Sequence, residues 1–426
     1  MRFITPKGSV VNSDMYIERP ELEKALEKSI IKPKHIIIYG ESGSGKTWLY
    51  KNLFAKQNIN YEVLNSATII TTGSLTKAVQ SLLSTLNPVK STGYDEKKSA
   101  KTSAIVVEGG LEHTDKYEYQ TEDPFLGLVK HIGSTSSKKP IFLVIENVEH
   151  IVNNKDYVKE LSALLLYLDD ERYSKYNVRL LIVGTPTDIR DYFASQDNGQ
   201  TIVNRVQEIP EVSVLSNSQT AALAERGLVK KLKYKIDSNY KTGTGETKPY
   251  SDKKVYHDIS WFTANIPQYI HELCLEISLE AERNNKIISC NIFYDALFDW
   301  LKSSLVSEHS RLEHNINSVE TKHGRRNQVI YAMSQILYNE FNYQEIEAEV
   351  RKHFPTSTSN KTLNVSGVLS ELSNGQFQII RKVPKGTKYR FIDPRIKIVA
   401  RWMLTKEDEN SEVLTVTKFD DTIKLF

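Results

Sequence analysis

The 426-residue chain is long enough for two to four domains, and its 39% hydrophobic and 26% charged residues are typical of a soluble globular protein. No apolar run is long enough to span a bilayer and no secretory h-region opens the sequence, so we expect no membrane association. The two cysteines, Cys274 and Cys290, exclude a disulfide framework or a cysteine-based zinc cluster and favour a reducing, cytoplasmic location.

The most specific feature of the sequence is a glycine-rich segment between a short apolar strand at 35–39 and a helix at 47–54. It reads Gly40-Glu41-Ser42-Gly43-Ser44-Gly45-Lys46-Thr47, a complete Walker A phosphate loop. The glycines let successive backbone N–H groups face a β-phosphate. Lys46 is placed to reach the β- and γ-phosphates, and Thr47 to bind Mg²⁺. The sequence therefore predicts binding of a nucleoside triphosphate, with ATP and Mg²⁺ as cofactors.

Beyond this loop, strands and helices alternate, which is typical of a parallel sheet covered on both faces. Further strands are expected at 61–64, 141–145, 179–184 and 206–209. Helices are expected at 75–86, 157–168 and 187–193. We therefore expect an N-terminal strap over 1–30 and an α/β nucleotide-binding core over 31–215.

An insertion at about 88–123 interrupts the alternation. Within it, Gly109-Gly110 separates two β-type segments, and such a pair favours a two-residue hairpin turn. The inserted hairpin is expected to touch DNA, to touch a neighbouring protomer, or to do neither, and the sequence leaves these three alternatives open.

The pattern becomes helical from residue 216. Helices are expected at 218–232, 266–284 and 290–305, with a polar loop over 237–254. Together these segments predict a helical lid over 216–320.

Three helices and a two-stranded ribbon follow the expected lid. The helices are expected at 327–340, 343–354 and 361–372, the strands at 377–382 and 388–392, and a closing helix at 394–404. This order is the winged-helix pattern and predicts a winged-helix domain over 325–404. An acidic tail over 405–426 is expected to be loosely held.

The C-terminal segment is also strongly basic. Residues 325–404 hold 13 Lys and Arg against six acidic residues, a net charge of +7 in a chain whose total is +3. A basic module on a mildly acidic body indicates contact with a polyanion, for which duplex DNA is the natural candidate. The candidate contacts lie on the ribbon and its turn: Arg381, Lys382, Lys385, Lys388 and Arg390. The helix at 361–372 has one basic residue, so we expect phosphate contacts rather than base reading.

A phosphate loop needs an acid that orients Mg²⁺ from the end of a buried strand, and the strand at 141–145 runs into Glu146-Asn147-Val148-Glu149. Glu146 occupies the Walker B position, where aspartate is usual. Asn147 stands where a hydrolytic enzyme places a second acid, and an amide cannot accept a proton. We therefore expect slow hydrolysis unless Glu149 or a partner helps.

Several motifs in this order carry a family resemblance. They are Tyr16-Ile17-Glu18-Arg19-Pro20-Glu21, the phosphate loop, Ile145-Glu146-Asn147 and Val183-Gly184-Thr185-Pro186. The chain resembles, over about residues 14–404, the AAA+ P-loop ATPases of the origin-recognition and STAND branches. The ending Tyr389-Arg390-Phe391-Ile392-Asp393-Pro394 resembles the winged-helix ending of archaeal and bacterial members. The fold class implied is α/β: a P-loop NTPase (AAA+) parallel-sheet core with a helical lid and a C-terminal winged-helix domain.

The resemblance also implies roles for single residues. Arg19 would lie near the adenine, Thr185 would be the sensor-1 residue near the γ-phosphate, and Arg205 would be an arginine finger that reaches the ATP of the adjacent subunit. Pro267 would mark the point where the lid touches the base, with Asn265 in place of the usual glycine. No sensor-2 arginine is evident there, which favours a switch over a fully hydrolytic enzyme.

Two functions follow from these observations. The first is an ATP-dependent AAA+ switch and weak ATPase that self-assembles as a homo-oligomer and engages duplex DNA through its winged helix. The alternative is a STAND-like signalling or defence scaffold whose oligomerisation activates a partner effector protein. The sequence does not choose among replication, transposition and anti-phage defence, and a motor is disfavoured by Asn147.

Overall fold

The computed structural model describes residues 10–86, 123–133, 139–185, 193–194, 199–237, 239–241, 247–317, 324–338, 340–383, 386–406 and 411–419. The expected inserted hairpin, the turn residue Lys385 and nearly all of the expected helix at 187–193 fall outside these residues, since positions 87–122 are not among them. The chain divides into two compact units, one of residues 19–40 and 49–212, the other of residues 1–18, 41–48 and 213–426.

The first unit is built on a five-stranded parallel sheet with the order β2-β3-β4-β1-β5. Its strands are β1 (His35–Tyr39), β2 (Tyr61–Asn65), β3 (Ile141–Glu146), β4 (Val178–Gly184) and β5 (Val206–Glu208). The central strands β1, β3 and β4 are almost entirely buried, which is why they read as continuous apolar runs rather than alternating ones. All five predicted strands are present.

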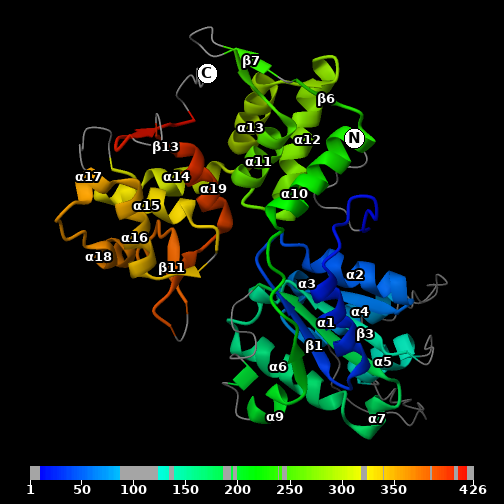
Figure 1. The fold of residues 1–426 in the computed structure, drawn as a ribbon. Coiled ribbons are helices and arrows are strands. Elements are labelled where there is room, and N and C mark those ends of the chain that lie inside the picture. Colours follow the sequence, from blue (N-terminus) through cyan, green and yellow to red (C-terminus); the bar gives the residue numbers. More distant parts are fainter. Residues whose placement is uncertain are drawn as a thin grey trace, which may run out of the picture. The chain divides into compact units, whose positions relative to one another are not determined.

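Helices cover both faces of this sheet (Figure 1). Alternate residues of β1 point to opposite faces of the sheet. Ile36 and Ile38 pack with the apolar residues of α1 and α2, whereas Ile37 packs with those of the other helices. On the first face lie α1 (Pro20–Ile31) and α2 (Lys46–Gln57). On the second face lie α3 (Ser66–Thr72), α4 (Leu75–Leu86), α5 (Pro124–Gly133), α6 (Lys155–Tyr167), α7 (Glu171–Ser174) and α9 (Gly199–Val203).

The second unit is mainly helical. Its first part holds α10 (Asn217–Ala224), the π-helical turn η2 (Glu225–Lys231), α11 (Asp252–Phe262), α12 (Pro267–Arg283), α13 (Cys290–Ser304) and α14 (Val306–Glu313). Short pairs accompany them: β6 (Lys235–Ile236) with β9 (Ile287–Ile288), and β7 (Asn239–Lys241) with β8 (Thr247–Pro249). The expected helix at 218–232 is thus regular only to Ala224, and a helix begins inside the expected polar loop, at Asp252.

The C-terminal part of this unit alternates helices with a small sheet. Its elements are α15 (Arg325–Gln335), β10 (Glu340–Phe341), α16 (Tyr343–His353), α17 (Pro355–Thr358), α18 (Val365–Leu372), β11 (Ile380–Lys382), β12 (Tyr389–Phe391) and α19 (Pro394–Met403). The sheet is antiparallel with the order β10-β12-β11. Two predicted helices are shorter than expected: α15 stops at Gln335, because Ile336 is extended, and α18 starts only at Val365.

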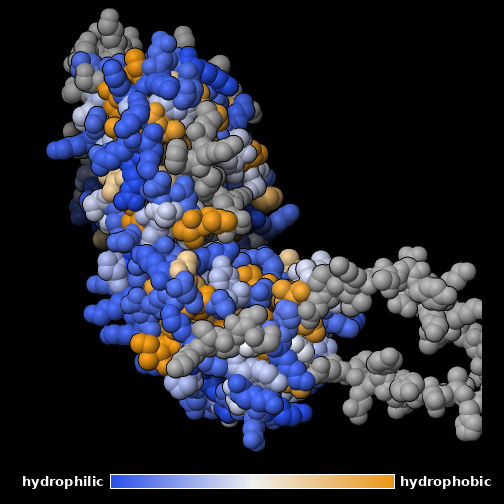
Figure 2. Space-filling model, turned by 90° about the vertical axis from the view of Figure 1, so that its right-hand side faces the viewer, coloured by the Kyte–Doolittle hydropathy of each residue, from blue (hydrophilic) through white to orange (hydrophobic). Residues whose placement is uncertain are grey.

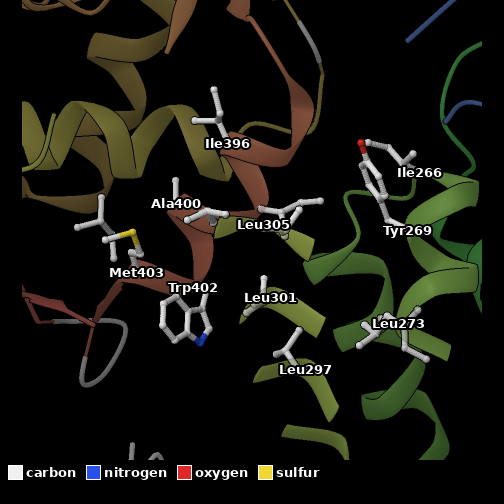
Figure 3. Packing of buried hydrophobic residues seen from close by; sticks show 14 of the residues in the cluster. Ile266, Tyr269, Leu273, Leu297, Leu301, Leu305, Ile396, Ala400, Trp402 and Met403 are labelled. Atoms are coloured by element: carbon white, nitrogen blue, oxygen red, sulfur yellow. The ribbon is translucent and has the colours of Figure 1, made fainter. Parts of the chain in front are cut away.

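One continuous hydrophobic cluster runs through the second unit. In Figure 3, Ile396, Ala400 and Trp402 of α19 lie among the same set of buried side chains as Leu301 and Leu305. Strand β13 (Leu404–Lys406) pairs with β14 (Leu414–Val416), and apolar residues of both strands pack on this cluster. The expectation of a loosely held tail is therefore wrong for residues 411–419. The predicted boundary between lid and winged helix remains a prediction.

Among the described residues, no helix is both long and apolar enough to cross a bilayer. The face drawn in Figure 2 is largely hydrophilic, with hydrophobic side chains in separate groups.

Candidate nucleotide site

The phosphate loop has the backbone that its glycines predict. Gly43 and Gly45 adopt φ values of 76° and 92°, in the region where a side chain is strained. The Ser44 N–H donates to the Glu41 carbonyl at 3.1 Å, and the Lys46 ammonium donates to the same carbonyl at 2.8 Å. Helix α2 begins at Lys46, so its N-terminal N–H groups follow the loop directly. This combination is suited to binding phosphate.

The loop packs against the start of α12, where Pro267 is the first helical residue. The Gln268 N–H donates to the Gly43 carbonyl at 3.2 Å. A Cβ atom on Gly43 would lie 3.0 Å from Ile266 and Gln268 side-chain atoms, so a side chain does not fit without a shift. Asn265 has φ of 60°, a left-handed conformation that glycine adopts readily and that asparagine tolerates.

A second contact to the loop comes from β12, where Arg390 forms an ion pair with Glu41. The two side chains are 5% and 15% exposed. A second acid, Glu340, lies 3.8 Å from the same guanidinium (Nη1 to Oε1). Arg390 is thus a buried residue that contacts the phosphate loop; its burial does not favour a DNA contact, and that assignment remains a prediction.

Glu146 closes β3 in the first unit, and its Oε1 atom accepts a hydrogen bond from the Tyr50 hydroxyl at 3.0 Å. Burial, together with the nearby Glu146 carboxylate, raises the pKa of Tyr50, so the phenol stays a donor. Tyr50 thereby fixes the orientation of the Glu146 carboxylate, the candidate Walker B acid.

The Thr47 hydroxyl and the Glu146 carboxylate are each the kind of oxygen ligand that Mg²⁺ prefers, and their roles as metal ligands remain predictions. When bound, Mg²⁺ would neutralise phosphate charge. Within the described residues there is no cluster of three or more His, Cys, Asp or Glu side chains able to hold a metal by themselves.

Asn147 and Glu149 lie in the turn after Glu146. Asn147 has φ of 60° and is exposed, and the 3₁₀ turn Val148–His150 follows it. The Glu149 Oε2 atom accepts a hydrogen bond from the Thr185 N–H at 3.2 Å. The candidate sensor-1 residue Thr185 and a carboxylate are thus joined at the end of β4.

Arg205 directly precedes β5, the edge strand that pairs in parallel with β1. It therefore lies at the amino-terminal end of this strand. Its side chain is ion-paired with Asp169 and donates to the Thr201 carbonyl at 2.9 Å. Arg19 precedes α1 and is half-buried, and its N–H donates to Glu23 at 3.3 Å. The finger and adenine roles of these two residues remain predictions.

On the basic ribbon, Lys382 and Lys388 are exposed and Arg381 is half-buried. Arg381 stands directly opposite Arg390 in the sheet, and Glu340 stands opposite Arg390 on its other side. Of the five candidate DNA contacts, the two lysines are therefore the ones the structure describes as open to solvent.

Sequence reasoning missed Tyr50 and the pairing of Arg390 with Glu41. Tyr50 lies three residues after Thr47, one turn along α2. A residue with a polar group at this position could have been predicted to contact the site. Arg390 and Glu41 are 349 residues apart in the sequence, and no local sequence pattern predicts an ion pair between them.

Comparisons with known proteins bear on the fold of the core. Residues 31–193 match the family model described as AAA domain. The core has the AAA+ P-loop NTPase fold. The chain is similar to a Walker-type ATPase of Pyrococcus abyssi, with a TM-score of 0.50 and 13% identity over 92% of this chain and 98% of that one. The ORC2 protein of Aeropyrum pernix, in its ADPNP–ADP complexes, gives a TM-score of 0.49 and 12% identity over 93% and 96%. No curated protein matches the sequence.

Proposed function

We propose that this chain is an ATP-binding AAA+ switch. It hydrolyses ATP slowly, assembles into a homo-oligomer when ATP is bound, and engages duplex DNA through a C-terminal winged helix. The observation that carries the proposal is the phosphate loop, which has glycines at positive φ and ends in Lys46 at the start of α2.

Slow hydrolysis is supported by Asn147, since an amide cannot take the proton of an attacking water. The DNA contact is supported by the exposed Lys382 and Lys388 on a module of net charge +7. The pathway served by such a switch is left open by these observations.

A second candidate is the STAND-like scaffold, whose ATP-driven oligomerisation activates an effector protein without DNA binding. The burial of Arg390 favours it, because one of the ribbon's arginines serves the phosphate loop instead of facing solvent. Duplex DNA binding at low salt with ATP present separates the two functions.

The test of the ATP site is Lys46→Ala in the full chain, followed by calorimetry with Mg²⁺ and ATP. We expect loss of measurable binding, because the lysine charge that neutralises the β- and γ-phosphates is removed. Lys77→Ala, an exposed lysine of α4, is the matched control and should bind like wild type. Wild-type affinity in Lys46→Ala would refute the site.

A further inference from the structure

Glu149 is a carboxylate in the turn after β3 that is held at the end of the neighbouring strand β4. The turn after β3 begins at Asn147, whose left-handed backbone redirects the chain into the 3₁₀ segment Val148–His150. Val148 is fully buried in the core and anchors this segment. Glu149, half-buried, then accepts the Thr185 N–H at 3.2 Å. The carboxylate is therefore held at the end of β4 rather than left to solvent.

The sheet register places this point beside the start of the phosphate loop. Strand β4 lies between β3 and β1, and Gly184 is the partner of Tyr39. Gly40, the first loop residue, follows Tyr39, and Thr185 follows Gly184, so the two chains leave the sheet at adjacent positions. In open α/β sheets, ligands bind beyond the carboxyl ends of the strands, at this kind of edge.

The other acidic and amide groups of the turn are less suited to proton transfer. Glu146 accepts a hydrogen bond from the Tyr50 hydroxyl and is the expected Walker B acid. Asn147 has no proton-accepting carboxylate. One N–H bond leaves the Glu149 carboxylate with further lone pairs, because an ionised carboxylate offers about four acceptor positions.

We propose that Glu149 is the group that orients and deprotonates the attacking water in ATP hydrolysis, two residues beyond the usual position. This inference rests on the proposed ATPase function. In the step, the water oxygen forms a bond to the γ-phosphorus and the bond from that phosphorus to the bridging oxygen breaks. The electron pair stays with the β-phosphate of ADP, and the water proton passes to Glu149 and then to solvent.

The decisive variant is Glu149→Gln in the full chain, because the glutamine oxygen can still accept the Thr185 N–H but cannot take a proton. Single-turnover hydrolysis of γ-labelled ATP should fall by roughly 10²- to 10³-fold, while ATP affinity by calorimetry stays within about threefold. His150→Gln, an exposed residue of the same turn, should change neither quantity.

A carboxylate at the usual position provides the rescue. Asn147→Glu combined with Glu149→Gln should recover at least about tenfold of the lost rate, which a purely structural role of Glu149 would not allow. Hydrolysis at the wild-type rate by Glu149→Gln overturns the inference, as does wild-type protein that binds ATP without hydrolysing it. A parallel fall in ATP affinity and thermal stability also overturns it, since Glu149 would then only anchor β4. If wild type binds no ATP, it is the proposed function that fails.

Discussion

Arg390 of β12 and Glu41 of the phosphate loop form an ion pair that is largely shielded from solvent. Arg390 also stands between Glu340 and Arg381 in the three-stranded sheet, so the pair links the loop to the C-terminal module. Attraction between charges is stronger in such shielded places than at the surface. A change in the charge of the phosphate loop should therefore change the strength of its interaction with Arg390.

Arg390→Ala should weaken ATP binding by about tenfold, or ~1.4 kcal/mol, because Glu41 then adds an uncompensated negative charge beside the phosphates. The double variant Arg390→Ala/Glu41→Gln should return to within about threefold of wild type. Calorimetry measures both, with the exposed Lys361→Ala as control. Unchanged affinity in Arg390→Ala would show that the pair does not influence the nucleotide.

Lys382→Ala/Lys388→Ala should weaken duplex DNA binding equally for all sequences and reduce the slope of log affinity against log salt by up to about two. Both lysines are exposed, so the cost to folding should be small. Fluorescence anisotropy from low to moderate salt provides the measurement. Lys77→Ala/Lys253→Ala removes the same charge from exposed positions elsewhere and should leave the slope unchanged. An equal loss of DNA affinity in both double variants would mean that only the net charge of the protein matters. Absence of DNA binding by the wild-type protein would favour the signalling-scaffold function.

Arg205→Ala should lower ATP-induced assembly, measured by light scattering, while ATP binding by the isolated subunit stays intact. The pairing with Asp169 supplies a matched comparison, because Asp169→Asn breaks the ion pair but keeps the arginine. An arginine that acts on the next subunit predicts that only Arg205→Ala reduces assembly. If the two variants behave alike, Arg205 has only its observed intramolecular role.

His35 should make the first unit sensitive to acid. Its Nδ1 atom accepts the Leu180 N–H at 3.0 Å, and burial lowers its pKa to about 4. The folded pKa lies below that of the unfolded chain, near 6.5, so the stabilisation is complete above pH 6.5 and is lost as the pH falls towards 4. The free energy of unfolding should drop by about 2 kcal/mol from pH 7 to pH 5 through this group. Urea unfolding of wild type and His35→Asn measures it, and the variant should show a smaller drop.

His257→Asn serves as the control for that experiment, because it also replaces a histidine by asparagine but at a side chain that is 65% exposed. His271 is buried, and burial lowers its pKa to about 4 too, so it adds to the same pH window in the other unit. A pH dependence in His35→Asn equal to that of wild type would contradict the assignment.

The sequence by itself determined the phosphate loop and the sheet that carries it. Glycines before Lys46 specify a loop with positive φ, and continuous apolar runs such as 141–145 specify strands buried on both faces, because both signals are local. The sequence predicted the ends of the helices less accurately. α15 stops at Gln335 although the apolar spacing continues, since the chain there turns into the small sheet.

Only the tertiary structure decided how the charged residues are used. On the ribbon, Arg390 and Lys388 look alike in sequence, yet one is buried against Glu41 and the other is exposed. Glu149 reaches Thr185 because β3 and β4 are neighbours in the sheet, and Arg205 is held by an aspartate 36 residues away. These contacts depend on packing between segments distant in sequence, where burial strengthens charge interactions that no local pattern encodes.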